Sequence, residues 1–190
     1  MSTFRTVIYL LRSRNFQKCF LNGRSLLNHL IRTHQLLLKQ GFPKEVAYVG
    51  LLHSFYGELK GYKADGFRHE ERYLLKTLVG EDIENWVYLY HKSIEEGRLF
   101  DPFEIKEQCI LGRLENKIHM SKETYSNLLN VSFLDIIEQV QFLSDLKKET
   151  KYSDFFPYLR RYSGLRHFLT ESNRALLNYY FSFQKEKHVG

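Results

Sequence analysis

The sequence predicts one all-α domain, and three observations support that prediction. Almost every long segment repeats its apolar residues with a period of about 3.6, and none alternates over enough residues to predict a strand. A chain of 190 residues is long enough to bury a hydrophobic core. With only 3 prolines and 11 glycines, it leaves little room for a long flexible linker. We therefore expect a single domain over residues 1–190.

The first two predicted helices have clear boundaries. Leu26, Leu30 and Leu37 share one stripe of the first helix, and Gly41 follows its last turn as a stop signal. Pro43 stands just ahead of the second helix, where its missing N–H does no harm. The two helices should therefore fold back on each other as a hairpin. Their expected ranges are 25–40 and 44–55, and a loop marked by Gly57, Gly61 and Asp65-Gly66 follows them.

Five further long helices are expected downstream. Gly80 separates the first two of them, and Glu81 lies in the opening turn of the second, where an acid suits the helix dipole. The longest begins near Ser121, a residue type that caps helix N-termini. Ahead of it the pattern weakens, apart from a short helix expected after Pro102. The five ranges are about 68–79, 81–92, 121–148, 154–162 and 170–183.

The net charge of the chain limits the classes of molecule that it is expected to bind. The formal net charge is +6, but the basic residues are scattered, and Lys147-Lys148 and Arg160-Arg161 are the only pairs in helix-patterned segments. No nucleic-acid motif or basic arm is present, so nucleic-acid binding is not expected. The charge admits an anionic small-molecule partner such as a phosphorylated metabolite, and a solvated, mildly cationic surface is the plainer explanation.

The sequence also predicts a cytoplasmic protein. Cys19 and Cys109 are too few for a disulfide framework, which favours a reducing compartment. No stretch approaches the roughly 18 apolar residues that a membrane span needs. The apolar run over residues 7–11 lacks a charged start and a small-residue cleavage site, so it is not expected to be a signal peptide.

Two histidines fall on the predicted inward faces of the helical hairpin. His29 follows Leu26 by one turn, and His53 ends the apolar run that starts at Val46. A buried histidine needs partners for both ring nitrogens, and a lone one usually makes a structural hydrogen bond. For two histidines on adjacent helices, a metal site or an acid–base site is about as well supported as a pair of structural hydrogen bonds.

Four short motifs within residues 24–142 point to a known family. They are Arg24-x4-His29, Leu51-Leu52-His53, the helix–glycine–helix passage from Leu75 to Val87, and Phe133-Leu134-Asp135. Together they resemble the HD-domain superfamily of metal-dependent phosphohydrolases, and the third motif resembles its guanosine tetraphosphate hydrolases. The resemblance implies an HD-like helical core over about 24–142, with helices over 150–185 packed on it. It also implies that His29, His53 and Asp135 hold a divalent metal ion.

The sequence departs from that superfamily at one position. His53-Ser54 stands where the superfamily has a His-Asp doublet, and a serine hydroxyl is a much weaker metal ligand than a carboxylate. The remaining two-histidine, one-carboxylate set can hold one divalent ion, whereas a two-metal site is hard to build. The phrase His53-Ser54-Phe-Tyr-Gly57 also resembles a branch of HD-like proteins in which serine is the regular residue. Metal binding and its absence both stay open.

Other residues have candidate roles near the doublet, each with a plainer alternative. Ser54 could orient an imidazole, and Glu58 or Glu84 could accept a proton, although both acids also suit a solvated loop or a first helical turn. Tyr56 could donate to a substrate oxygen or simply pack. Arg24 could bind a phosphate, a carboxylate or a surface acid. Glu138, one turn after Asp135, could support that aspartate or face solvent.

Three functions follow as hypotheses. The first is an HD-like hydrolase of a phosphorylated small molecule or nucleotide, in which one divalent ion activates water. The second is a metal-independent enzyme that uses His29 and His53 as acid and base on a small organic substrate. Its pocket would be lined by aromatic residues, with Phe55, Tyr56, Trp86 and Tyr88 as candidates. The third is a non-catalytic binding module on a degenerate HD scaffold. The helices after about residue 148 are expected either to cap the site or to form the contact of a homodimer.

Overall fold

The computed structural model describes residues 3–56, 66–95, 98–111, 117–146 and 153–187. In these ranges the chain is mostly helical, with eight α-helices and two small antiparallel sheets. The prediction of a helical fold is therefore confirmed in its main part. The prediction of a purely all-α fold is wrong, because short strands occur in two places.

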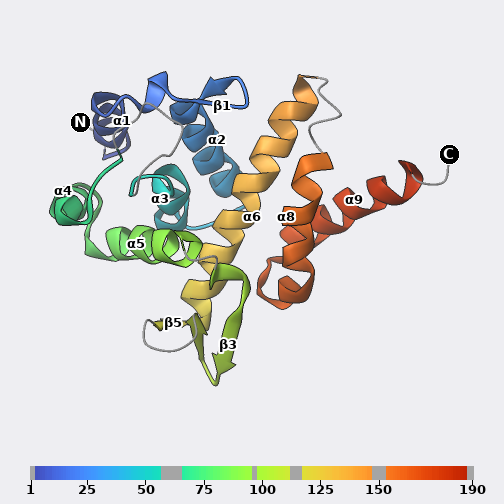
Figure 1. Ribbon diagram of the computed structural model, residues 1–190. Coiled ribbons are helices and arrows are strands. Elements are labelled where there is room, and N and C mark those ends of the chain that lie inside the picture. The colour runs from blue at the N-terminus through green and yellow to red at the C-terminus, as the bar shows by residue number, and fades with distance from the viewer. Residues whose placement is uncertain (1–2, 57–65, 96–97, 112–116, 147–152, 188–190) are drawn as a thin grey trace.

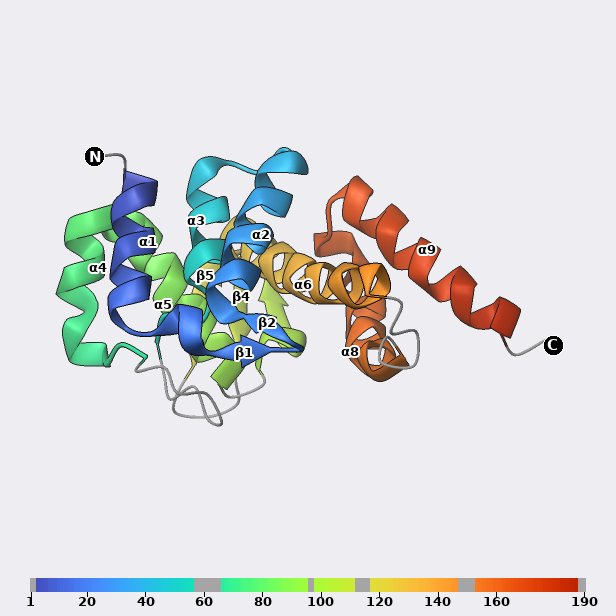
Figure 2. The same cartoon turned by 90° about the horizontal axis from the view of Figure 1, so that it is seen from above.

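One long helix organises the molecule. Helix α6 (Lys122–Asp145) runs through the middle, with α1 to α5 on one side of it and α8 (Phe156–Arg161) and α9 (Glu171–Lys187) on the other (Figure 1). Seen from above, α9 projects away from the other helices, and the two ends of the chain lie far apart (Figure 2). Among the described helices, none is long and apolar enough to cross a membrane.

The predicted helical hairpin is present. Helix α2 (Leu26–Lys39) begins after Ser25, whose hydroxyl accepts the N–H of Asn28 at 3.2 Å as an N-cap. Helix α3 (Lys44–Leu52) begins after Pro43 and ends three residues earlier than expected. The two helices approach closely at Gly50. A Cβ added to Gly50 would lie 2.2 Å from Leu37 Cδ1, so glycine sets the spacing of the hairpin.

The next two predicted helices are also confirmed. Helix α4 (Arg72–Val79) follows a 3₁₀ turn at His69–Glu71, and Gly80 ends it with a φ of +92° that glycine adopts without strain. Helix α5 (Glu81–Glu95) runs three residues longer than expected. Helix α1 (Thr3–Ser13) was not predicted, and it packs against α2 and α4.

The first sheet is a hairpin just ahead of α2. Strand β1 (Phe20–Leu21) pairs with β2 (Arg24–Ser25) through a turn at Asn22 and Gly23, which both have positive φ. Asn-Gly is a strong signal for such two-residue turns, so the sequence contained a sign of this hairpin. The hairpin matters because its second strand carries Arg24 to the start of α2.

The second sheet overturns the short helix expected after Pro102. Strands β3 (Pro102–Ile105), β4 (Gln108–Leu111) and β5 (Ile118–Ser121) form an antiparallel sheet in that order. Each strand has only four residues, too few for a visible alternation of apolar and polar side chains. Pairing between strands therefore decides the structure here, and local sequence does not reveal it.

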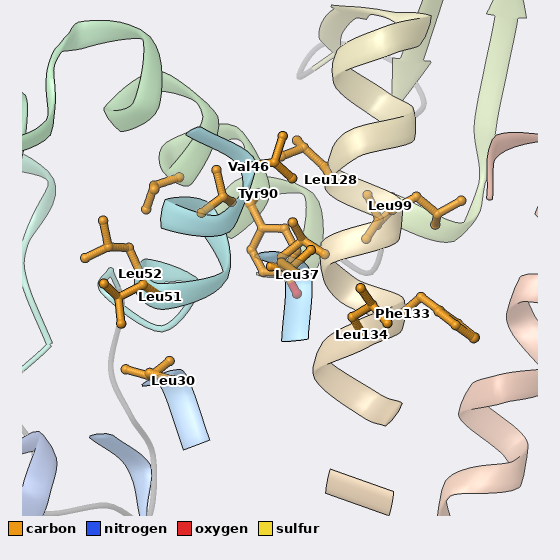
Figure 3. Packing of buried hydrophobic residues seen from close by; sticks show 14 of the residues in the cluster. Leu30, Leu37, Val46, Leu51, Leu52, Tyr90, Leu99, Leu128, Phe133 and Leu134 are labelled. Carbon is orange, nitrogen blue, oxygen red and sulfur yellow. The ribbon is translucent and has the colours of Figure 1, made fainter. Parts of the chain in front are cut away.

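The core gathers around α6. Figure 3 shows Leu128, Phe133 and Leu134 of this helix together with Leu51 and Leu52 of α3, and all five side chains are fully buried. Burial of each such side chain contributes about 1.5–3 kcal/mol. The helix is buried on most of its surface, so any polar residue on it needs a partner within the protein.

Polar residues of α6 tie the C-terminal segment to the core. Asn130 is buried, its Nδ2 donates to the carbonyl of Phe168 at 2.9 Å, and its Oδ1 accepts from Thr170 N at 3.1 Å and from Asn173 Nδ2 at 2.7 Å. Ser132 shares a hydrogen bond of 2.8 Å with the hydroxyl of Tyr162. These contacts hold the region of α8 and α9 against the side of α6.

Candidate metal centre

Three residues from three separate segments meet inside the bundle. The Nε2 of His29 lies 2.9 Å from Asp135 Oδ1, and the Nε2 of His53 lies 3.7 Å from the same oxygen. The two imidazole ring centres are 5.2 Å apart. One ligand atom from each residue can be chosen so that all three lie within 4.8 Å of one another. The structure therefore brings together the three residues that the sequence grouped as metal ligands.

Each member of this triad sits on a different helical element. His29 lies in the second turn of α2, His53 is the residue that ends α3, and Asp135 lies in the middle of α6. The side chain of His29 is 1% exposed, that of His53 8% and that of Asp135 18%. A site built on three packed helices is held more precisely than one built on loops.

The end of α3 orients His53. Its Nδ1 lies 2.8 Å from the carbonyl oxygen of Gly50, one of the last carbonyls of the helix. A carbonyl only accepts hydrogen bonds, so Nδ1 carries the proton and Nε2 presents its lone pair toward Asp135. Burial lowers the pKa of His53 below its ordinary value, which favours the neutral form that can bind a metal.

A buried carboxylate orients His29. The Nδ1 of His29 donates to Glu138 Oε2 at 2.6 Å, and Glu138 also binds both terminal nitrogens of Arg24 and the Nε of Arg32, the last at 2.9 Å. Burial lowers the pKa of His29, but hydrogen bonds to Asp135 and Glu138 outweigh it and raise the pKa above its ordinary value. A carboxylate behind an imidazole is the arrangement that orients histidine ligands in metal sites.

Asp135 supplies the negative charge of the triad. Burial alone would raise its pKa, but His53, His29 and a 3.1 Å hydrogen bond from Gln139 Nε2 together lower the pKa to about 2. The carboxylate is therefore ionised at neutral pH. Two imidazole nitrogens and one carboxylate oxygen form a donor set suited to a single divalent first-row ion.

The structure gives Arg24 and Glu138 a common role. Arg24 is only 7% exposed; its guanidinium lies 4.0 Å from the centre of the Phe142 ring and is bound to Glu138. Arg24 therefore holds a carboxylate of the protein itself, in place of the substrate anion considered from the sequence. Glu138 supports His29, whereas the sequence suggested Asp135 as its partner.

Glu84 and Tyr56 belong to a different polar cluster. Glu84 is fully buried and accepts hydrogen bonds from Tyr56 Oη at 2.6 Å and from Arg72 Nε at 2.6 Å. Neither residue lines the cavity beside the triad, in contrast to the roles expected for them as base and substrate donor. Ser54 does line that cavity. Glu58, the other candidate base, lies outside the described residues.

A cavity of about 720 Å³ lies beside the triad, and all three triad residues line it. Such a volume is within the range of small-molecule sites in proteins. The aromatic residues expected from the sequence do not line it; a different aromatic set does, together with several aliphatic and polar side chains. The described lining residues beyond the triad include Ser54, Tyr90, Phe100, Ser132, Leu143, Asp154, Phe155, Tyr158 and Arg161.

Sequence reasoning missed two parts of this lining. Tyr90 is 3% exposed, and its ring lies edge-on to the ring of His53, with the centres 6.0 Å apart. It falls on α5 one turn after Trp86, and nothing in its spacing distinguishes it from a packing residue. The other part is the segment around α8, where Tyr158 and Arg161 reach the cavity. That segment therefore contributes side chains to the cavity beside the triad.

Comparison with known families gives a match to part of the chain. Residues 10–93 match a family described as Domain of unknown function (DUF6817). The matched segment contains His29 and His53-Ser54 but ends before Asp135 and Glu138. No curated protein and no solved structure matches the chain.

Proposed function

We propose that this protein is a metal-dependent hydrolase in which His29, His53 and Asp135 hold one divalent ion. The observation that carries the proposal is the direction of the two imidazoles. Each ring has its Nδ1 engaged by an acceptor, Glu138 for one and the Gly50 carbonyl for the other, and each turns its Nε2 toward Asp135. A purely structural histidine has no need for this common direction.

The donor set fits one ion better than two. Ser54 stands where a second carboxylate would be needed, and Glu138 is engaged by two arginines and His29. A divalent ion bound here would lower the pKa of a water molecule to near neutrality and so provide a nucleophile. The substrate we propose is a phosphorylated small molecule or nucleotide, in line with the resemblance of residues 24–142 to the HD-domain superfamily.

The residues around the triad have defined tasks in this proposal. Glu138 and Gly50 fix the two imidazoles, so that little reorganisation is needed when an ion binds. Asp135 provides the anionic ligand that offsets the charge of the ion. The apolar side chains of the cavity provide a surface against which the body of a substrate can pack.

A second candidate is supported by the opposite pKa shifts of the two histidines. The pKa of His53 is lowered and that of His29 is raised, and the rings are 5.2 Å apart beside the cavity. A pair of groups driven apart in pKa is typical of an acid and a base that act together. This enzyme would use His53 as the base and His29 as the acid on a small organic substrate, with no metal.

Metal analysis of the full chain separates these functions. Protein purified without chelator is analysed for bound metal, and manganese, iron, zinc and magnesium are tested for thermal stabilisation. We expect about one ion per chain, and at least a hundredfold weaker binding in His29→Ala and His53→Ala. His34→Ala is the matched control, because His34 is a buried histidine of the same helix that bonds the Ala47 carbonyl away from the triad.

The possible results have distinct meanings. Loss of binding in the two triad variants alone supports the metal site. A wild-type protein that neither carries nor is stabilised by any of the four metals rules it out and leaves the acid–base enzyme or a non-catalytic module. Equal loss of binding in His34→Ala also counts against the proposal, because binding would then follow general stability.

A further inference from the structure

The cavity beside the triad has two chemically different parts. One part consists of the triad with the hydroxyl-bearing residues Ser54, Tyr90 and Ser132. The remainder is largely apolar, and its described side chains include Leu26, Ile136, Leu143, Phe100, Phe155 and Tyr158. A ligand that fills this space can place a polar group at the triad and an apolar body against the apolar side chains.

The aromatic side chains of the cavity contact their neighbours. The ring of Phe100 meets the buried ring of Tyr162 edge-on, with centres 5.2 Å apart. The guanidinium of Arg161 lies 5.4 Å from the ring centre of Phe100 and 5.5 Å from that of Tyr158. Phe100 and Tyr158 thus present two aromatic rings near one another at the cavity, and flat apolar surfaces favour a ring-shaped partner.

The positive charge on the cavity wall is limited. Among the described residues that line the cavity, Arg161 is the one arginine or lysine, and Asp154 lines it as well. Arg24 and Arg32 are close in sequence to His29, but Glu138 binds both. A triphosphate or tetraphosphate chain needs several cations for its charge, so this lining suits a ligand with a single anionic group.

From these observations we propose that the site takes a phosphate monoester with an apolar, ring-sized body. The phosphate lies at the triad, and the ring lies against the wall formed by Phe100 and Tyr158. This inference rests on the proposed function, because the phosphate needs the metal ion as its main electrostatic partner. It narrows the substrate from phosphorylated compounds in general to monoesters of a cyclic apolar group.

Binding of two simple phosphates to the cobalt-loaded protein tests the proposal. The full chain is loaded with cobalt(II), whose visible absorption reports a change in its ligands, and is titrated with methyl phosphate and with phenyl phosphate. We expect phenyl phosphate to bind about tenfold more tightly, because its ring buries additional apolar surface. In Tyr158→Ala this preference should fall to about threefold or less, while methyl phosphate binds as before.

Two further variants make the result specific. Tyr179→Ala is the matched control, because Tyr179 is 54% exposed and Tyr158 49%, but Tyr179 does not line the cavity. Tyr158 is half exposed, so its removal should leave the fold intact. Phe100→Leu changes the other aromatic face and should lower the phenyl preference in the same direction.

The outcomes distinguish this inference from the function on which it rests. Failure to bind cobalt, or His53→Ala binding it as well as the wild type, overturns both. Cobalt binding at the triad with equal affinities for the two phosphates overturns the inference alone. A phenyl preference that survives in Tyr158→Ala and Phe100→Leu places the ring elsewhere and also overturns it.

Discussion

The Oε2 atom of Glu138 lies 2.6 Å from the Nδ1 of His29, although the two residues are 109 positions apart in the chain. This contact turns the opposite nitrogen of the ring toward Asp135. It also couples the proposed metal centre to a buried ion pair, because the same Oε2 atom of Glu138 also binds Arg24. Stability and metal binding therefore depend on one carboxylate.

The first prediction concerns Glu138→Gln. The substitution keeps the shape of the side chain but leaves the charge of Arg24 buried without compensation, at an expected cost of about 3 kcal/mol in the free energy of unfolding. Metal affinity should fall about 10- to 100-fold, because the neutral amide of Gln is a weaker acceptor for the Nδ1–H of His29 than the carboxylate that orients it. Denaturant unfolding of the metal-free protein and a metal titration measure the two effects. Glu123→Gln, an exposed change on the same helix, is the control, and an unaltered metal affinity in Glu138→Gln would contradict the prediction.

The second prediction is that metal affinity decreases in acid. Burial lowers the pKa of His29, yet Asp135 and Glu138 raise it above 6.5, so the ring holds its second proton to a higher pH than a free histidine does. A metal ion must displace that proton from Nε2. Below the raised pKa the apparent affinity should therefore fall about tenfold for each pH unit. Calorimetric titrations at pH values from about 6 to 8 measure it, and a constant affinity across this range would disprove the competition.

The third prediction concerns the close approach of α2 and α3. Gly50→Ala places a methyl group against the buried Leu37 side chain, which must shift, and should cost about 1–2 kcal/mol in stability. Because Gly50 also provides the carbonyl that orients His53, metal binding should weaken as well. Gly164→Ala is the matched control, since an added Cβ there meets nothing within 4 Å. Thermal unfolding compares the two variants, and equal stabilities would refute the packing argument.

The fourth prediction separates the two buried polar clusters. Glu84→Gln removes the charge that faces Arg72 and should destabilise the fold by about 2–3 kcal/mol. Metal affinity should stay within about twofold of the wild type, because Glu84 does not line the cavity beside the triad. Denaturant unfolding and metal titration of the same preparation measure the free energy of unfolding and the metal affinity. A large loss of metal affinity with only a modest loss of stability would contradict the separation and would mean that Glu84 acts at the metal site.

The helical part of the fold was predictable because its signals are local. Gly41, Pro43, Gly80 and Ser121 mark helix boundaries by capping or by their backbone preferences, and the structure places the boundaries within a few residues. The sheet of β3, β4 and β5 was not predictable in this way. Its strands are stabilised by pairing with each other, and four residues are too few to carry a periodic signal.

The residues of the candidate site also differ in whether local sequence could predict them. His29 and His53 could be placed inward from their spacing on neighbouring helices, and Asp135 entered through the resemblance of a short motif. Tyr158 and Arg161 could not be placed at the cavity, because their position depends on how α8 packs against α6. The family match over residues 10–93 contains His29 and His53 but neither Asp135 nor Glu138.

The two imidazoles are steered by different kinds of partner. His53 is oriented by the main chain at the end of α3, through the carbonyl of Gly50, so its direction depends on where that helix ends. His29 is oriented by the side chain of Glu138, so a single substitution at position 138 can change the orientation of its ring. One ligand of the proposed centre is thus fixed by the path of the backbone, and the other remains adjustable by mutation at a distance.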